Sequence, residues 1–178
     1  AENVTVEDCE FDNIYDSAVT HQGGSASPAK NLIIRNNIFK RCGMAAYEQR
    51  DVLPESGEFT GNICLAAGEG FSHMGIELPR YSEIYPQPMG HHIFMWRIDT
   101  CEGKTDFRIT DNTFGDAPYG AMIYSICGRE PEEKTEIDYN LYNCKKYALI
   151  NKYYGTAFDD FEEYRRVTDK DKHSKLEN

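Results

Sequence analysis

Four side chains that can transfer protons or hold polar groups occupy similar places in a repeated sequence pattern. His21, Glu48 and Tyr124 each lie 11 to 13 residues after a recurring short phrase, and Arg97 does so when a long insertion is left out. Imidazole and carboxylate groups act as general acids and bases, whereas Arg and Tyr bind hydroxyl or carboxylate groups. We expect the four to form one column on the outer face of a sheet, which is either a binding groove or an ordinary solvated surface.

The long insertion, residues 66–91, holds a second set of candidates. Its Gly, Pro, Tyr and His residues suit a functional loop, since structureless loops beyond about 15 residues usually have a role. The polar candidates there and just beyond are Glu77, Arg80, Tyr81, His91 and His92. The alternative is that the loop only covers a hydrophobic flank. Adjacent histidines in a strand point to opposite faces, so we expect no two-histidine metal site.

The elements that must position these groups are indicated by the recurring phrase. Its copies are Asn37-Ile38-Phe39, Asn62-Ile63-Cys64, Asn112-Thr113-Phe114 and Asn140-Leu141-Tyr142, with Cys9-Glu10-Phe11 as a degenerate first copy. The copies start 28, 25, 50 and 28 residues apart. A unit of about 25 residues therefore recurs, as in solenoids and propellers. β-Prone runs precede most copies and a further strand follows each bend, which predicts strand, tight turn, strand and loop in each unit.

Neither a leucine-rich repeat nor a propeller fits two or three short strands per unit. A parallel β-helix does. We predict an all-β, right-handed parallel β-helix, a solenoid of about five coils, with a short C-terminal helix. Each Asn of the phrase is expected to adopt a positive φ and to bond through its amide to the Asn of the next coil. The residues two positions later are expected in the core; they are Phe11, Phe39, Cys64, Phe114 and Tyr142.

Two runs of the chain, NLIIRNNIFKRCG and DFRITDNTF, resemble the right-handed parallel β-helix (pectate-lyase-like) superfamily, which includes pectate lyases and many secreted polysaccharide hydrolases. The resemblance covers residues 3–155, and the tail resembles the closing coil and short helix of such domains. We therefore divide the chain into β-helix coils at 1–155 and a C-terminal helix and capping tail at 156–178. The resemblance implies a secreted, bacterial-type, carbohydrate-active protein whose partner is a polysaccharide or oligosaccharide.

The resemblance leaves two kinds of catalysis open. A hydrolase would need two carboxyl groups in a surface groove, about 5 to 5.5 Å apart for retention or about 6.5 to 9.5 Å apart for inversion. Glu48 with Glu77, or Glu48 with Asp51, is the pair that we expect. A lyase would need a base beside a uronate carboxylate, with His21, Arg97 and Tyr124 as candidates. Further candidates for sugar contacts are Arg80, Tyr81, Trp96 and His92.

A third possibility is a non-catalytic module that binds glycan or only supports a larger protein. Carboxylates that converge in a groove would favour an enzyme, whereas solitary acids scattered over the surface would favour the module. The sequence starts at Ala1 without a signal peptide, and its first β-prone run arrives by Val4. This start favours a piece of a longer β-helix chain, the rest of which would be a partner.

The composition narrows the choice of partners. Asp and Glu number 30 against 19 Lys and Arg, which gives a net charge of −11. This charge disfavours nucleic acid and anionic membranes, and it favours neutral or weakly charged glycans. No apolar stretch approaches the roughly 20 residues of a membrane span. No clustered Asp triplet suggests calcium, and the cysteines lack zinc or redox spacing, so we expect no cofactor.

The cysteines and the C-terminal segment carry structural predictions. Because Cys64 replaces a core aromatic residue and Cys9 a phrase Asn, buried free thiols are expected rather than disulfides. Phe158, Phe161 and Tyr164 recur at a spacing of three, with Val167 next, which predicts an amphipathic helix whose aromatic stripe packs on the last coil. Its expected cap is Thr156 or Asp159.

Overall fold

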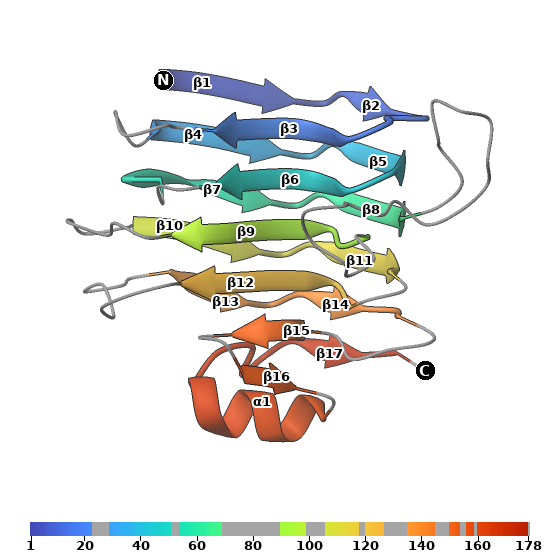
Figure 1. The fold of residues 1–178 in the computed structure, drawn as a ribbon, viewed down its shortest axis with the longest axis vertical. Helices are drawn as coiled ribbons and strands as arrows, with labels where there is room; N and C mark the ends of the chain where they lie inside the picture. Colours follow the sequence, from blue (N-terminus) through green and yellow to red (C-terminus); the bar gives the residue numbers. More distant parts are fainter. Residues whose placement is uncertain are drawn as a thin grey trace.

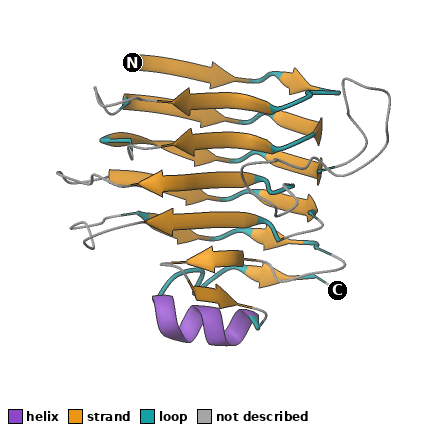
Figure 2. Cartoon of the chain, viewed as in Figure 1, coloured by secondary structure: helices purple, strands orange, loops and turns teal. Residues whose placement is uncertain are grey.

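The computed structural model describes residues 1–22, 29–50, 54–68, 90–98, 106–117, 120–126, 135–144, 150–153, 156–158 and 160–177. Within these ranges the chain forms three sheets and one short helix, α1 (Phe161–Thr168), at the end opposite to the N-terminus (Figures 1 and 2). The prediction of an all-β chain with parallel sheets and a short C-terminal helix is confirmed.

Each sheet takes every third strand of the chain up to β15. The first sheet consists of β1 (Glu2–Glu7), β4 (Lys30–Arg35), β7 (Ser56–Thr60), β10 (Asp106–Thr110) and β13 (Glu136–Asp138). The second consists of β2 (Glu10–Phe11), β5 (Ile38–Cys42), β8 (Ile63–Ala67), β11 (Thr113–Asp116), β14 (Leu141–Tyr142) and β17 (Lys175–Leu176). Neighbouring strands in both sheets are parallel.

The third sheet consists of β3 (Ser17–Gln22), β6 (Ala45–Arg50), β9 (Ile93–Ile98), β12 (Met122–Ile126), β15 (Ile150–Tyr153) and β16 (Thr156–Phe158). Its strands are parallel except that β16 runs antiparallel to β15. We call one strand from each sheet, taken in chain order, a repeat, so that β1, β2 and β3 form the first repeat. The recurring phrase thus begins a strand of its own, in the second sheet, rather than forming only a turn.

Four asparagines hold successive repeats together in a buried ladder: Asn37, Asn62, Asn112 and Asn140. The Asn62 side chain donates to the Ile34 carbonyl of the preceding repeat (3.0 Å) and accepts from the Asn37 backbone N–H (3.0 Å). The Asn37 amide also donates to Asn62 Oδ1 (3.1 Å), and the same three contacts recur at Asn112. The predicted bonds between phrase asparagines are confirmed.

The predicted positive φ of the ladder asparagines is wrong by one position. The residue before each ladder position takes it: Asp8 (54°), Asn36 (55°), Gly61 (64°), Asp111 (59°) and Tyr139 (58°). The physical reason is that the ladder Asn must extend its backbone into the second-sheet strand while its side chain reaches the preceding repeat. The preceding residue therefore makes the turn, where Asn, Asp and Gly tolerate the left-handed conformation.

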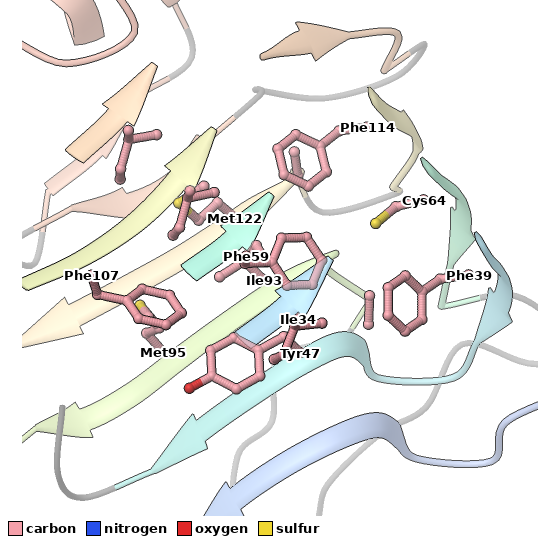
Figure 3. Packing of buried hydrophobic residues seen from close by; sticks show 14 of the residues in the cluster. Ile34, Phe39, Tyr47, Phe59, Cys64, Ile93, Met95, Phe107, Phe114 and Met122 are labelled. Atoms are coloured by element: carbon pink, nitrogen blue, oxygen red, sulfur yellow. The ribbon is translucent and has the colours of Figure 1, made fainter. Parts of the chain in front are cut away.

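The core lies between the sheets and contains a run of stacked rings among aliphatic side chains (Figure 3). Phe39, Cys64, Phe114 and Tyr142 are each at most 1% exposed, so their inward placement is confirmed. Phe39 stacks on the half-buried Phe11 with ring centroids 4.9 Å apart. Where Cys64 interrupts the stack, Phe59 of β7 bridges it, with centroids 5.9 Å from Phe39 and 6.5 Å from Phe114. Burial holds the pKa of the Cys64 thiol well above its usual value.

The strand β7 was not expected, because its sequence Ser-Gly-Glu-Phe-Thr has a single large apolar residue and an internal Gly. Gly57 has a φ of 149°, and a Cβ there would lie 2.1 Å from the Leu32 carbonyl oxygen of β4. Gly therefore permits the close approach of β7 to β4, and Phe59, at 0% exposed, supplies the buried surface.

The tail closes the sheets much as expected, with two differences. The cap of α1 is Asp160, whose carboxylate accepts from the Glu163 N–H (2.7 Å), rather than Thr156 or Asp159. Phe158 lies on β16, and its ring packs edge-on against that of Tyr164 with the ring centroids 5.5 Å apart. Val167 is 56% exposed and is not part of the buried stripe. After α1, Ser174 takes the next ladder position, since its Oγ accepts from the Asn140 N–H (2.8 Å).

Candidate functional site

The strand register places Glu48 in a different column from His21 and Tyr124, although we expected these residues in one column. In the third sheet Thr20 pairs with Glu48 and Glu48 with Phe94. His21 pairs instead with Gln49, Gln49 with Met95, and Met95 with Tyr124. The single column was therefore wrong by one residue, and because side chains alternate along a strand, His21 and Glu48 point to opposite faces.

The inner of these two columns belongs to the interior. Gln49 is fully buried and accepts from the Tyr47 hydroxyl (2.8 Å), whose ring stacks on Phe59 and Phe107 in the core. His21 lies one repeat before Gln49 and is half-buried. Burial lowers the pKa of His21, although a hydrogen bond with Gln49 partly offsets this. His21 thus caps a core column rather than facing a substrate beside Glu48.

The outer column holds a buried carboxylate. Glu48 is 1% exposed; one of its oxygens accepts from the Thr20 hydroxyl (3.1 Å) and the other contacts the Arg50 Nε. The Arg50 guanidinium also lies over the Phe94 ring, 5.9 Å from its centroid, and contacts the Met44 sulfur (3.6 Å). We call Thr20, Met44, Glu48, Arg50 and Phe94 the Glu48 cluster. Because both carboxylate oxygens of Glu48 have partners, Glu48 is better described as the acid of an ion pair than as a free catalytic acid.

Both carboxylate partners expected for Glu48, and two of the residues expected to contact sugar, lie outside the described residues. These are Asp51, Glu77, Arg80 and Tyr81. The backbones of Trp96, Arg97 and Tyr124 are described as parts of β9 and β12, and Trp96 pairs with Arg50, but the structure does not describe their side chains. No carboxylate separation for a catalytic pair can therefore be assigned, and these roles stay predictions.

His91 and His92 precede β9 and are both buried. His91 Nδ1 donates to the Gly120 carbonyl (2.7 Å), and His92 Nε2 donates to the Gly115 carbonyl (3.1 Å). The His92 ring stacks on Phe114 at 5.6 Å. Burial lowers the pKa of each imidazole from 6.5 to about 4. The expectation that His92 contacts sugar is therefore corrected: its ring faces the core. In the described ranges no three His, Cys, Asp or Glu side chains are grouped to hold a metal ion.

Acids on the outer faces of the first repeat pair with bases of the second. Glu7 binds Arg35 (2.6 Å), Glu10 binds Lys40 (2.6 Å) and Asp12 binds Arg41 (2.9 Å). Farther along the first sheet, Arg108 contacts Glu58. Each of these exposed pairs contributes little to stability because solvent screens it, but the pairs occupy carboxylates that a surface catalyst would need.

The four described cysteines are free thiols: Cys9, Cys42, Cys64 and Cys144. The prediction of a buried thiol is confirmed for Cys64 and wrong for Cys9, which is exposed. Burial raises the pKa of Cys42 and of Cys144 to about 12, so neither is an activated nucleophile at neutral pH.

The sequence reasoning missed a group on the outer surface near the C-terminus. Tyr139 is 53% exposed, and its ring stacks on His173 with centroids 4.8 Å apart and an angle of 7° between the ring planes. Asp138 accepts from the Tyr139 N–H (2.8 Å) and the His173 N–H (2.7 Å), and its other oxygen binds His173 Nδ1 (2.7 Å). The signal available was Tyr139 itself, which occupies a turn position held elsewhere by Asp, Asn or Gly.

Comparison with protein-family models, with curated proteins and with solved structures finds no match to this chain. Within the described residues, no helix is long and apolar enough to cross a membrane.

Proposed function

We propose that this chain is a right-handed parallel β-helix that binds neutral polysaccharide outside the cell without cleaving it. What supports the β-helix is that strands three apart in the chain are parallel neighbours from β1 to β15, at phrase spacings of 25 or 28 residues, and of 50 where the long insertion lies. The right hand follows from the general rule that crossover connections between parallel strands are right-handed in about 98% of cases.

The observation that carries the non-catalytic part is that Glu48 and three acids of the first repeat already have partners. Glycoside hydrolysis needs two carboxyl groups, one to protonate the leaving oxygen and one to attack or to activate water. Glu48, the acid with the best prior claim, is buried and bonded to Thr20 and Arg50. Glu7, Glu10 and Asp12 are paired with bases. Paired acids distributed over several faces suit a binding module.

The choice of a neutral polysaccharide rests on charge. The chain carries a net charge of −11, which repels a polyuronate in the absence of a local excess of bases. Three exposed bases of the second repeat, Arg35, Lys40 and Arg41, are already neutralised by acids of the first, and Lys30 is neutralised by Glu55. A neutral glycan needs hydrogen-bond partners for its hydroxyl groups and a flat apolar surface for the C–H faces of its rings. It needs no compensating charge.

The test is affinity electrophoresis through gels that contain a mixed-linkage β-glucan, a glucomannan or a polygalacturonate, with product analysis of the same mixtures. We expect retardation by a neutral polymer, weaker or no retardation by polygalacturonate, and no new reducing ends or unsaturated uronates. New products that disappear in Glu48→Gln would assign catalysis to this carboxylate and overturn the non-catalytic proposal. Migration that is unchanged in all three gels would overturn the binding proposal.

A further inference from the structure

Tyr139 has a backbone conformation that its side chain does not favour. The residues before the ladder positions of the first four repeats are Asp8, Asn36, Gly61 and Asp111, all with φ between 54° and 64°. Asp, Asn and Gly enter this left-handed region at low cost, whereas a bulky residue there is uncommon. Tyr139 occupies the fifth such position with a φ of 58°. Backbone outliers of this kind persist where the surrounding structure holds them, and they are concentrated at active and ligand-binding sites.

Burial does not explain why Tyr stands there. The Tyr139 side chain is 53% exposed, so it contributes little to the core. Its ring lies parallel to that of His173, which precedes ladder residue Ser174 as Tyr139 precedes Asn140. The two rings are thus neighbours in adjacent repeats and stack face to face on the outside of the turn, so that each ring covers one face of the other while about half of each side chain stays exposed.

Asp138 fixes the orientation of the imidazole. Its carboxylate accepts two backbone N–H groups and binds His173 Nδ1, so that in the neutral ring the proton is held on Nδ1 and Nε2 becomes an acceptor. Burial alone would raise the pKa of Asp138, but the hydrogen bonds from His173 and Tyr139 bring it below its usual value. His173 remains exposed, with 59% of its side chain accessible. An oriented acceptor therefore lies beside an exposed ring.

We propose that Tyr139 and His173, oriented by Asp138, form a subsite for one ring of a neutral sugar. The C–H face of a pyranose packs on the phenol or imidazole face that is turned away from the stack, and the imidazole Nε2 and the phenol hydroxyl bond to sugar hydroxyls. The subsite rests on the proposed function, because it supplies the contact surface that this function requires. The structural alternative is that the stack only fastens the tail after α1 to the fifth repeat.

A sugar subsite and a purely structural stack predict different effects of Tyr139→Asn on stability and binding. Asn36 shows that Asn fits the same turn with nearly the same φ, so the substitution removes the ring without disturbing the backbone. A subsite predicts a melting temperature that is unchanged or higher and a binding constant about tenfold weaker, as the loss of one good aromatic contact implies. A fastening role predicts a lower melting temperature. Val167→Ala is the matched control, since Val167 is also an exposed apolar residue, 56% accessible, but on α1.

The experiment is NMR titration of the isotope-labelled chain with cellohexaose, xylohexaose and mannohexaose, one at a time. We expect one of them to shift the Tyr139 and His173 resonances, and Tyr139→Asn but not Val167→Ala to weaken binding about tenfold. Binding that shifts other residues and survives Tyr139→Asn would overturn the subsite and leave the proposed function standing. If none of the three hexasaccharides shifts any resonance of the wild type, the proposed function fails, and the subsite fails with it.

Discussion

The two buried histidines should make the stability of this protein depend on pH in a way that single substitutions can isolate. His91 and His92 each have a pKa near 4 in the folded chain, against 6.5 for a solvated imidazole. The unfolded chain therefore binds more protons between pH 4 and 6.5. Their contribution to stability is complete above about pH 6.5 and is lost as the pH falls towards 4. The fully buried His91 Nε2 has no partner in the described structure, so protonation there would bury an unpaired N–H.

The magnitude follows from the pKa values. Proton linkage for a group that moves from 6.5 to about 4 gives a loss of about 2 kcal/mol per histidine between pH 7 and pH 5. His91→Asn keeps a donor near the position of Nδ1 for the Gly120 carbonyl, and His92→Gln keeps one near Nε2 for Gly115. Neither Asn nor Gln titrates, so each variant lacks the contribution of one histidine to the pH dependence of the unfolding free energy.

Urea denaturation at pH 7, 6 and 5 measures the effect. Other groups also titrate; burial raises the pKa of Asp171, for example, which stabilises the fold at low pH. These contributions cancel in the difference in unfolding free energy between wild type and variant. We expect this difference to shrink by about 2 kcal/mol from pH 7 to pH 5 for His91→Asn, and by a similar amount for His92→Gln. A difference that stays constant over this range would refute neutral burial of that histidine.

Three further predictions concern the packing of the repeats. Phe114→Ala should lower the free energy of unfolding in urea by about 3 to 5 kcal/mol, because it empties a fully buried ring site; a loss under about 1 kcal/mol would contradict the inward stack. Asn112→Ala leaves the Asn62 N–H and the Phe59 carbonyl without partners, so it should cost at least about 2 kcal/mol, whereas Asn36→Ala, at an exposed turn, should cost less than Asn112→Ala. Gly57→Ala should destabilise by more than about 2 kcal/mol, since its Cβ would meet the Leu32 backbone, while Gly61→Asn meets only the Asn36 side chain and should be milder; equal melting temperatures for these two variants would argue against the close approach of β7 to β4.

More of the architecture than of the candidate site could be predicted from the sequence. The phrase led to the ladder and the core stack because both use short-range chemistry that repeats: an amide spaced one repeat from the next, and an apolar side chain two residues later. The predictions made from the phrase were wrong by one residue in the turn and in the strand that follows it. The positive φ belongs to Asn36 rather than Asn37, and the column expected to contain both His21 and Glu48 divides between two faces.

The remaining errors have a common cause, since they depend on contacts between repeats that no single repeat encodes. β7 looks unlike a strand because Gly57 and Phe59 acquire their roles only against β4 and the ring stack. His92 looks like a surface ligand until Phe114 and Gly115 of the next repeat enclose it. Tyr139 drew no attention as a site because its significance lies in its φ and in a stack with a residue 34 positions away.

The central claim is that the chain advances repeat by repeat, each laid in parallel register on the one before. The most direct test is a set of nuclear Overhauser effects between backbone protons of register partners, in particular Phe39 with Cys64 and Cys64 with Phe114. The register predicts parallel cross-strand contacts at both pairs, and contacts between the side-chain amides of Asn62 and Asn112, which are 50 residues apart. Antiparallel contact patterns, or no contacts between these partners in a folded sample, would contradict it.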